Sequence, residues 1–316
     1  SFYDGNHFAN VLVKSREGRP IWLKGKKDGF TTGGITPIIS TSILNLYNSA
    51  RLNGPLKDGS QTTWSTADSE ITERLSTISN NSGKIRILSN TVISPSTKAT
   101  IDAFVEKYAN KDEFGNERSD AKHIQYDIQS YFGVRQANEK TFGKSFIPSY
   151  HFEKAKSIVS VNADFISSWL LPSKFSCDYS KTRKPENGWM SKHFQFESNY
   201  SLTGANADYR AQIKPSQEGV LISSLLSMLN GGNPTYDFSQ DVLTKLSNAV
   251  ISLKENKGAS LVVSGSNDPH IQAMVNKINF KLENYGSTIN HVQPLNLFQG
   301  NDTEVEQLVN DINANK

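Results

Sequence analysis

The stretch between residues 157 and 215 constrains the fold of this chain more than any other. Ile158–Val161 is a short apolar run followed by Asn162, which is typical of a buried strand in a parallel sheet. A second run ends at Glu197 and a third covers residues 208–213. Ligands bind beyond the carboxyl ends of such strands, so Asn162 and Glu197 are the first candidates for contacts with a nucleotide-like cofactor. The alternative is that Asn162 caps a helix and Glu197 is solvated.

A second candidate site follows a predicted strand at residues 260–264. Gly265, Ser266, Asn267 and Asp268 lead from this strand into a predicted helix, whose free N–H groups attract anions such as phosphate. The loop is neither a G-x-G-x-x-G fingerprint nor a P-loop with its lysine. A tight turn in which Asp268 caps the helix explains the same residues.

The order of elements indicates an α/β fold. Lys84–Ser89 is a predicted strand with a helix on either side of it in the sequence. We expect the strands at 260–264 and 288–292 to complete its sheet. Residues 110–122 are charged and nearly free of aliphatic side chains, which favours a surface loop at a domain boundary. Further helices are expected at 94–108, 129–142, 165–171, 173–179, 218–229, 241–254, 269–284 and 304–312.

The amino-terminal part begins with a β-hairpin signal. Phe8–Lys14 and Pro20–Lys24 alternate apolar and polar residues on either side of a turn that contains Gly18. A helix is predicted at Pro37–Tyr47 because proline is favoured at a first helical position. The next helix is predicted to begin near Ser65, whose hydroxyl would cap it.

Composition excludes several classes of protein. The 316 residues exceed one small core, and the net charge of +3 is too balanced for a dedicated nucleic-acid binder. No apolar run approaches the length of a membrane helix, so no direct membrane span is expected. The single cysteine, Cys177, rules out an intrachain disulfide or a four-thiolate iron–sulfur cluster, and the six histidines form no metal-binding spacing. We expect the chain to be a piece of a longer protein.

Several motifs together resemble the molybdopterin-dependent oxidoreductases. The segments that carry the likeness, in order along the chain, are LVKSREGRPIWLKG, TSILNLYNSARLNGPL, WSTADSEITERLSTI, SIVSVNADF, FQFESNYSLTGANADYRAQIKPS and LVVSGSNDPHIQAMVNKINFKLENYG. The chain is most similar to the amino-terminal half of the large iron–sulfur subunit of alternative complex III, a quinol-oxidising respiratory complex. The departures from active molybdoenzymes are the absent cluster cysteines, Val161 in place of a small residue before Asn162, and ESN in place of Asp-Pro-Arg at Glu197.

The resemblance implies three-layer α/β domains of the formate dehydrogenase/DMSO reductase type (domains 1–3), preceded by a small β-hairpin segment. It implies a structural domain without a cofactor, with iron–sulfur clusters in a later part of the parent protein. The implied partners are haem c and quinol-binding membrane subunits, and the implied location is the periplasmic side of the bacterial inner membrane, as a peripheral protein. The expected domains are 1–62, 63–122 plus 255–316, and 123–254.

Two other functions stay open. The first is a catalytic domain that binds molybdopterin guanine dinucleotide. In it Asn162, Glu197 and Ser266 contact the nucleotides, and Asp127 or Ser130 is a ligand of the metal. The second is a stand-alone α/β protein that binds a sugar or a nucleotide in a compact pocket.

Overall fold

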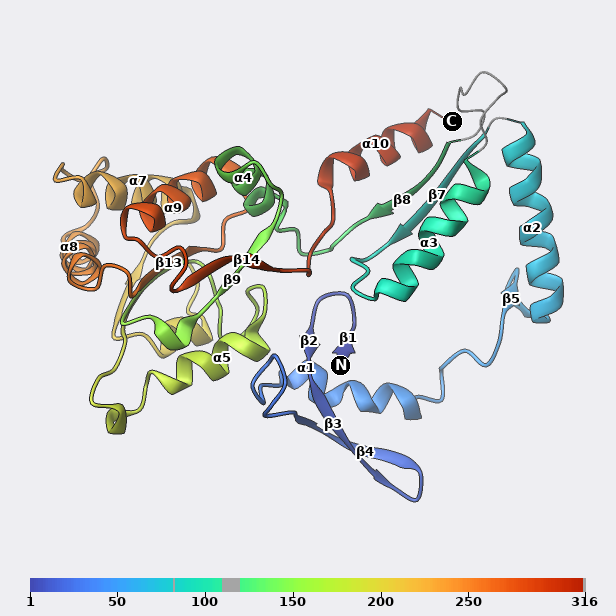
Figure 1. Ribbon diagram of the computed structural model, residues 1–316, viewed down its shortest axis with the longest axis horizontal. Coiled ribbons are helices and arrows are strands. Elements are labelled where there is room, and N and C mark those ends of the chain that lie inside the picture. The colour runs from blue at the N-terminus through green and yellow to red at the C-terminus, as the bar shows by residue number, and fades with distance from the viewer. Residues whose placement is uncertain (82, 110–119, 315–316) are drawn as a thin grey trace. The chain divides into compact units, whose positions relative to one another are not determined.

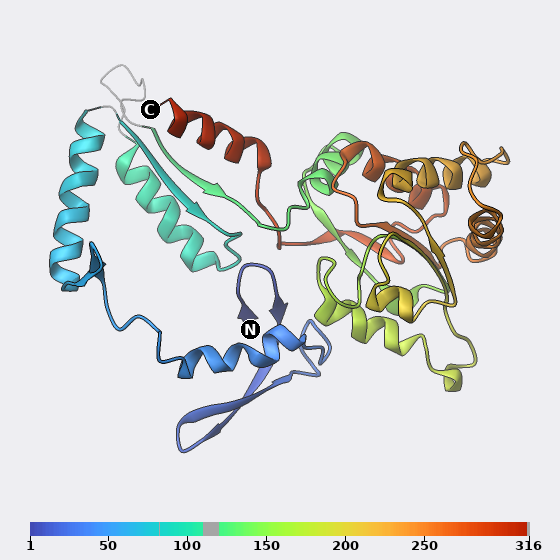
Figure 2. The same ribbon diagram turned by 180° about the vertical axis from the view of Figure 1, so that it is seen from behind.

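The computed structural model describes residues 1–81, 83–109 and 120–314 (Figures 1 and 2). The chain divides into two compact units, each made from two separate segments. Unit 1 contains Ser1–Thr41 and Tyr131–Leu297. Unit 2 contains Ser42–Ser130 and the chain from Phe298 onward.

Unit 1 is built on a parallel four-stranded sheet with the order β12-β11-β10-β13. The strands are β10 (Ser157–Val161), β11 (Lys192–Glu197), β12 (Tyr209–Gln212) and β13 (Ser260–Ser264). All five residues of β10 and of β13 are buried, which explains their continuous apolar and small-residue sequences. The runs expected at 158–161, 208–213 and 260–264 are therefore strands of one sheet.

Helices cover both faces of this sheet, which gives unit 1 three layers. Val159, Phe194 and Val262 form one core with α7 (Glu218–Leu229), α8 (Gln240–Glu255) and α9 (Pro269–Lys281). On the opposite face, the His193 ring contacts Phe165 and the Tyr179 ring of α5 (Pro172–Lys181). The alternation of side chains along each strand sends neighbouring residues to opposite layers.

The rest of unit 1 consists of shorter elements. Strand β9 (Ile147–Tyr150) pairs antiparallel with β14 (Ile289–Leu295), and β3 (Val11–Arg16) pairs with β4 (Arg19–Gly25). The other elements are β1 (Phe2–Tyr3), β2 (Phe8–Ala9), α1 (Pro37–Thr41), α4 (Phe132–Phe142), η2 (Phe152–Lys154), η3 (Pro185–Asn187), α6 (Leu202–Ala205) and η4 (Pro215–Gln217).

Unit 2 has a small parallel sheet of its own, in which β7 (Lys84–Ser89) pairs with β8 (Asp120–Gln125). Ile85, Ala121 and Tyr108 form its core with apolar side chains of the flanking helices. The remaining elements are η1 (Ser42–Tyr47), β5 (Leu56–Lys57), β6 (Ser60–Gln61), α2 (Trp64–Asn80), α3 (Pro95–Tyr108) and α10 (Asp302–Asn313).

The expected assignment of strands to domains is corrected by this pairing. The sheet of β7 was predicted to be completed by residues 260–264 and 288–292, but β13 pairs with β10 and β14 pairs with β9. The chain joins unit 2 again at Phe298, not at residue 255, and the predicted segment 1–62 is divided after Thr41. The strand count around β7 is misleading, because β13 pairs with β10 and is buried along its whole length in the sheet of unit 1.

Several local predictions are also corrected. Helix α2 begins one residue earlier than expected, and Thr63 caps it by accepting a hydrogen bond from the Thr66 N–H at 3.2 Å. The helix expected at 37–47 changes to a 3₁₀ helix after Thr41. Residues 165–170 form a turn and a bend in place of the helix expected at 165–171. Residues 110–119 of the expected boundary loop lie outside the described part of the chain, and residues 120–122 belong to β8.

Candidate functional site at the carboxyl edge of the sheet

Asn162 follows β10 and connects three elements of unit 1. Its backbone has a left-handed φ of 50°, a conformation that asparagine tolerates better than most residues. Its side-chain amide donates to the Glu218 carboxylate at the start of α7, and its Oδ1 accepts from the Ser198 N–H at 2.9 Å. Burial raises the pKa of Glu218 above its ordinary value, although the bond from Asn162 opposes this shift. The side chain of Asn162 is thus used within the fold.

Glu197 ends β11 and is 2% exposed, so the alternative in which it is solvated is wrong. Its carboxylate accepts hydrogen bonds from Arg210 Nε at 2.6 Å, Ser201 Oγ at 2.5 Å and Gln195 Nε2 at 3.1 Å. Burial acts to raise the pKa of Glu197, but the bonds from Ser201 and Arg210 outweigh it and hold the pKa below its ordinary value. A Cβ at Gly204 would lie 1.9 Å from Glu197 Oε1, so the carboxylate fills the space beside this glycine.

The space beside the loop after β13 is also occupied by other residues of the chain. The Gly265 N–H donates to the Val161 carbonyl at 2.9 Å, and a Cβ at Gly265 would lie 2.2 Å from the Asn162 carbonyl oxygen. Glycine is therefore needed here for the approach of another loop of the same chain. Asn267 Oδ1 accepts from the Gly133 N–H at 2.8 Å, and Ser266 Oγ accepts from the Asp268 N–H at 3.2 Å.

The amino end of α9 is capped by a carboxylate. Asp268 Oδ1 accepts from the N–H groups of His270 at 2.7 Å and Ile271 at 3.4 Å, as predicted for the helix cap. The donors and the positive end of the helix dipole that a phosphate would use are thus already engaged by an anion.

Acidic groups predominate at this edge of the sheet. Glu197 ends β11, and Asp164, Glu218 and Asp268 lie on loops and helix ends that follow the strands; Arg210 is paired with Glu197. The structure brings Asn162, Glu197 and the 265–267 loop to one edge of the sheet. There they form hydrogen bonds with other residues of the chain. Because the glycines face protein atoms and the helix end holds a carboxylate, these residues do not fit the phosphates of a dinucleotide.

The candidate metal ligands lie in unit 2 and have structural partners. Asp127 is 3% exposed and accepts from the Thr91 N–H at 3.0 Å, Thr91 Oγ1 at 2.7 Å and the Gly300 N–H at 2.7 Å. Ser130 Oγ donates to Asp302 Oδ2 at 2.7 Å. Within residues 1–81, 83–109 and 120–314, no group of three or more His, Cys, Asp or Glu side chains could hold a metal ion.

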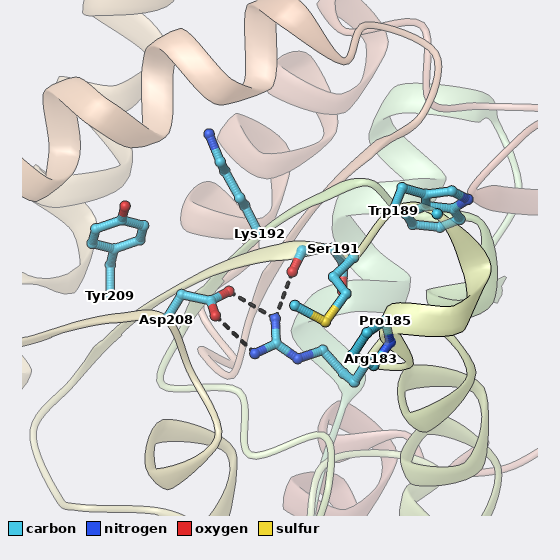
Figure 3. Close-up of a pocket in the computed structure, with 9 residues that line it drawn as sticks. Arg183, Pro185, Trp189, Ser191, Lys192, Asp208 and Tyr209 are labelled. Carbon is cyan, nitrogen blue, oxygen red and sulfur yellow. Dashed lines mark hydrogen bonds and ion pairs between the residues drawn. The ribbon is translucent and has the colours of Figure 1, made fainter.

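A pocket of about 540 Å³ lies at the opposite, amino edge of the sheet (Figure 3). Its lining residues are Arg183, Pro185, Gly188, Trp189, Met190, Ser191, Lys192, Asp208 and Tyr209. Arg183 donates twice to the Asp208 carboxylate, at 2.7 and 2.8 Å, and this pairing raises the pKa of the guanidinium. Sequence reasoning missed this pocket, and the only signal for it was Trp189 beside a polar loop.

Cys177 is partly exposed on α5. Burial raises the pKa of its thiol, and the neighbouring Asp178 adds to this effect. The neutral thiol is therefore favoured over the thiolate that nucleophilic chemistry requires.

Comparisons with known proteins give a likeness in fold. No family model matches the chain, and no curated protein matches it. Acetylene hydratase from Pelobacter acetylenicus superposes on 90% of this chain with a TM-score of 0.58 and 11% identity. This chain spans only 43% of that enzyme. The formyltransferase/hydrolase complex from Methylorubrum extorquens, solved with methylofuran, has a TM-score of 0.46 and 10% identity over 73% of this chain and 57% of its own.

The likeness to acetylene hydratase shows the fold alone. The chain has a mixed α/β fold, as expected from the sequence, and it is similar to that of acetylene hydratase. Among the described residues, no helix combines the length and apolar character needed to cross a bilayer.

Proposed function

We propose that this chain is a molybdopterin-oxidoreductase-like structural domain that holds no cofactor and supports an iron–sulfur domain of its parent protein. The parent is a subunit of a periplasmic, membrane-associated, quinol-oxidising complex of the alternative complex III type. The fold plan is that of domains 1–3 of formate dehydrogenase and DMSO reductase. Haem c and quinol-binding membrane subunits are the partners, and nucleic acid is not a partner.

The main support for a structural role is the way in which the carboxyl edge of the sheet is filled. Glu197 occupies the space beside Gly204, the Asn162 carbonyl occupies the space beside Gly265, and Asp268 occupies the amino end of α9. A dinucleotide would have to displace these contacts and place phosphates beside carboxylates, at a cost in desolvation and like-charge repulsion.

The continuous core of unit 1 supports this proposed role. A sheet with helices on both faces and a continuous buried core holds its surface loops in fixed positions. Such a unit can hold a neighbouring electron-transfer domain at a constant distance from its partners without taking part in the chemistry. The residues at the filled edge then act as internal hydrogen-bond partners.

Purification of the tagged full-length protein from detergent-solubilised native membranes tests the respiratory role. We expect it to co-purify with subunits that show haem c absorbance, with protein-bound iron, and with quinol-oxidising activity. A protein isolated alone from the soluble fraction, with neither iron nor haem-containing partners, would contradict this proposal.

A further inference from the structure

The amino-terminal hairpin of unit 1 is largely exposed to solvent. Strands β3 and β4 meet at a two-residue turn in which Glu17 and Gly18 have φ values of 51° and 78°. Of the thirteen strand residues, only Leu23 and Gly25 are buried. In both ribbon views the two strands project beyond the rest of unit 1 (Figures 1 and 2). A two-stranded ribbon this exposed gains little stability from its own packing.

One face of the hairpin alternates large apolar side chains with lysines. Leu12 lies opposite Lys24, and Lys14 lies opposite Trp22. Residues opposite each other in an antiparallel pair point to the same face, so these four side chains form a checkerboard. Leu12 is 53% exposed and Trp22 is 52% exposed. On the other face, Val13 and Ile21 are also about half exposed.

The hairpin concentrates positive charge. Residues 11–27 contain six Lys or Arg and one Glu, a net charge of +5, whereas the whole chain carries +3, so the other residues are net negative. Lys26 pairs with Asp28 at 3.6 Å. The other five cations have no ion pair within the described part of the chain: Lys14, Arg16, Arg19, Lys24 and Lys27.

This combination fits a lipid surface better than a protein surface. The cores of protein interfaces are depleted of lysine, yet Lys14 and Lys24 flank Trp22 on the same face. Tryptophan is enriched at membrane–water interfaces, and lysine can lay its apolar stem along a surface while its ammonium group reaches the headgroups. Anionic phospholipids attract clustered Lys and Arg by about 1 kcal/mol for each residue near the surface.

We propose that the β3–β4 hairpin docks the protein on an anionic phospholipid surface. Leu12 and Trp22 enter the headgroup region, and the five cations without ion pairs contact lipid phosphates. The hairpin therefore contacts the lipid headgroups at the surface of the membrane. This inference adds a lipid contact to the proposed membrane-associated role, and it does not depend on whether a cofactor is present.

Co-sedimentation of the full-length protein with lipid vesicles tests this proposal. We expect binding to vesicles of phosphatidylcholine that contain roughly 30% of the anionic lipid phosphatidylglycerol, and weak binding to phosphatidylcholine alone. The double variant Lys14→Gln/Lys24→Gln should bind the anionic vesicles about 25-fold more weakly, at about fivefold for each charge removed. High salt should weaken wild-type binding because it screens the same charges.

Matched variants outside the hairpin, one pair in unit 1 and one site in unit 2, separate docking from general charge. Lys277→Gln/Lys281→Gln removes the same charge from exposed positions around the end of α9 and should bind like the wild type. Trp22→Ser should weaken vesicle binding, whereas Trp64→Ser, at a site that is 69% exposed on α2, should not. Failure to bind anionic vesicles, equal binding to both kinds of vesicle, or equal loss in the control variants would overturn the proposal.

The metal content of the protein is independent of this test. A protein that carries molybdenum and binds anionic vesicles would contradict the structural role and support the lipid contact. A metal-free protein whose hairpin variants lose a protein partner but keep wild-type vesicle binding would support the structural role and contradict the lipid contact.

Discussion

The Glu197 carboxylate lies directly beside the α-carbon of Gly204, so that a Cβ at position 204 would stand 1.9 Å from Oε1. Four hydrogen bonds hold the carboxylate in this position, donated by the side chains of Gln195, Ser201 and Arg210 and by the Ser201 N–H. A side chain at the end of a parallel strand, where a ligand is often bound, is here a packing element of its own unit.

Substitution at Gly204 should therefore destabilise unit 1. We expect Gly204→Ala to lower the free energy of unfolding by about 1–3 kcal/mol, because overpacking forces the carboxylate or the α6 backbone to move. Urea denaturation followed by circular dichroism measures the change. Gly219→Ala on α7 is the control, since its Cβ would lie 3.4 Å from Ile271 Cδ1, and it should be neutral or slightly stabilising. Equal effects of the two variants would contradict this packing.

The pH dependence of stability should reveal the hydrogen bonds to Glu197. Its pKa is lowered in the folded state, so its contribution to stability is present above the unfolded pKa of about 4.5 and is lost as pH falls through the lower folded pKa. We expect Glu197→Gln to be less stable than the wild type at pH 7 and to lose less stability on acidification. Urea midpoints between pH 7 and pH 3 measure the difference, and parallel profiles for both proteins would contradict it.

His193 should produce a separate acid effect at higher pH. Burial between the Phe165 and Tyr179 rings lowers the pKa of His193 to about 4. The unfolded chain takes up a proton near pH 6.5, so stability falls as pH decreases from about 6.5 to about 4, by about 3 kcal/mol. His193→Gln should remove this part of the pH dependence, which chemical denaturation at a series of pH values can measure. A wild-type profile that is flat between pH 6.5 and pH 4 would oppose the prediction.

The cap of α9 should contribute to stability through hydrogen bonding more than through charge. We expect Asp268→Ala to cost about 1 kcal/mol, because the N–H groups of His270 and Ile271 lose their acceptor. Asp268→Asn keeps an acceptor oxygen and should cost less. Thermal unfolding of the two variants side by side tests this order, and an equal loss in both would argue against a hydrogen-bonded cap.

The sequence predicted the parallel strands well, because burial on both faces leaves a continuous apolar run such as Ile158–Val161. It also predicted the cap at Asp268 and the turn at Gly18, since both depend on local chemistry. Strand partners were less predictable. The β13 strand pairs with β10 across about 100 residues, and nothing in its own sequence distinguishes β10 from β7 as its neighbour.

The candidate site was predicted in position but not in contacts. Asn162, Glu197 and Gly265 do follow neighbouring strands at one edge. The sequence could not reveal that Ser201 and Arg210 turn towards Glu197, or that the Asn162 carbonyl lies against Gly265, because these contacts depend on loop conformation. For the same reason the sequence did not reveal the ion pair between Arg183 and Asp208, which are 25 residues apart in the chain.

The metal and pterin content of the full-length protein, purified from its native membranes, tests the structural role most directly. Molybdenum and tungsten are measured by elemental analysis, and pterin by fluorescence after denaturation and oxidation. The filled edge around Glu197, Gly265 and Asp268 predicts neither metal nor pterin above background. One molybdenum or tungsten atom per chain, together with a pterin released on denaturation, would contradict it.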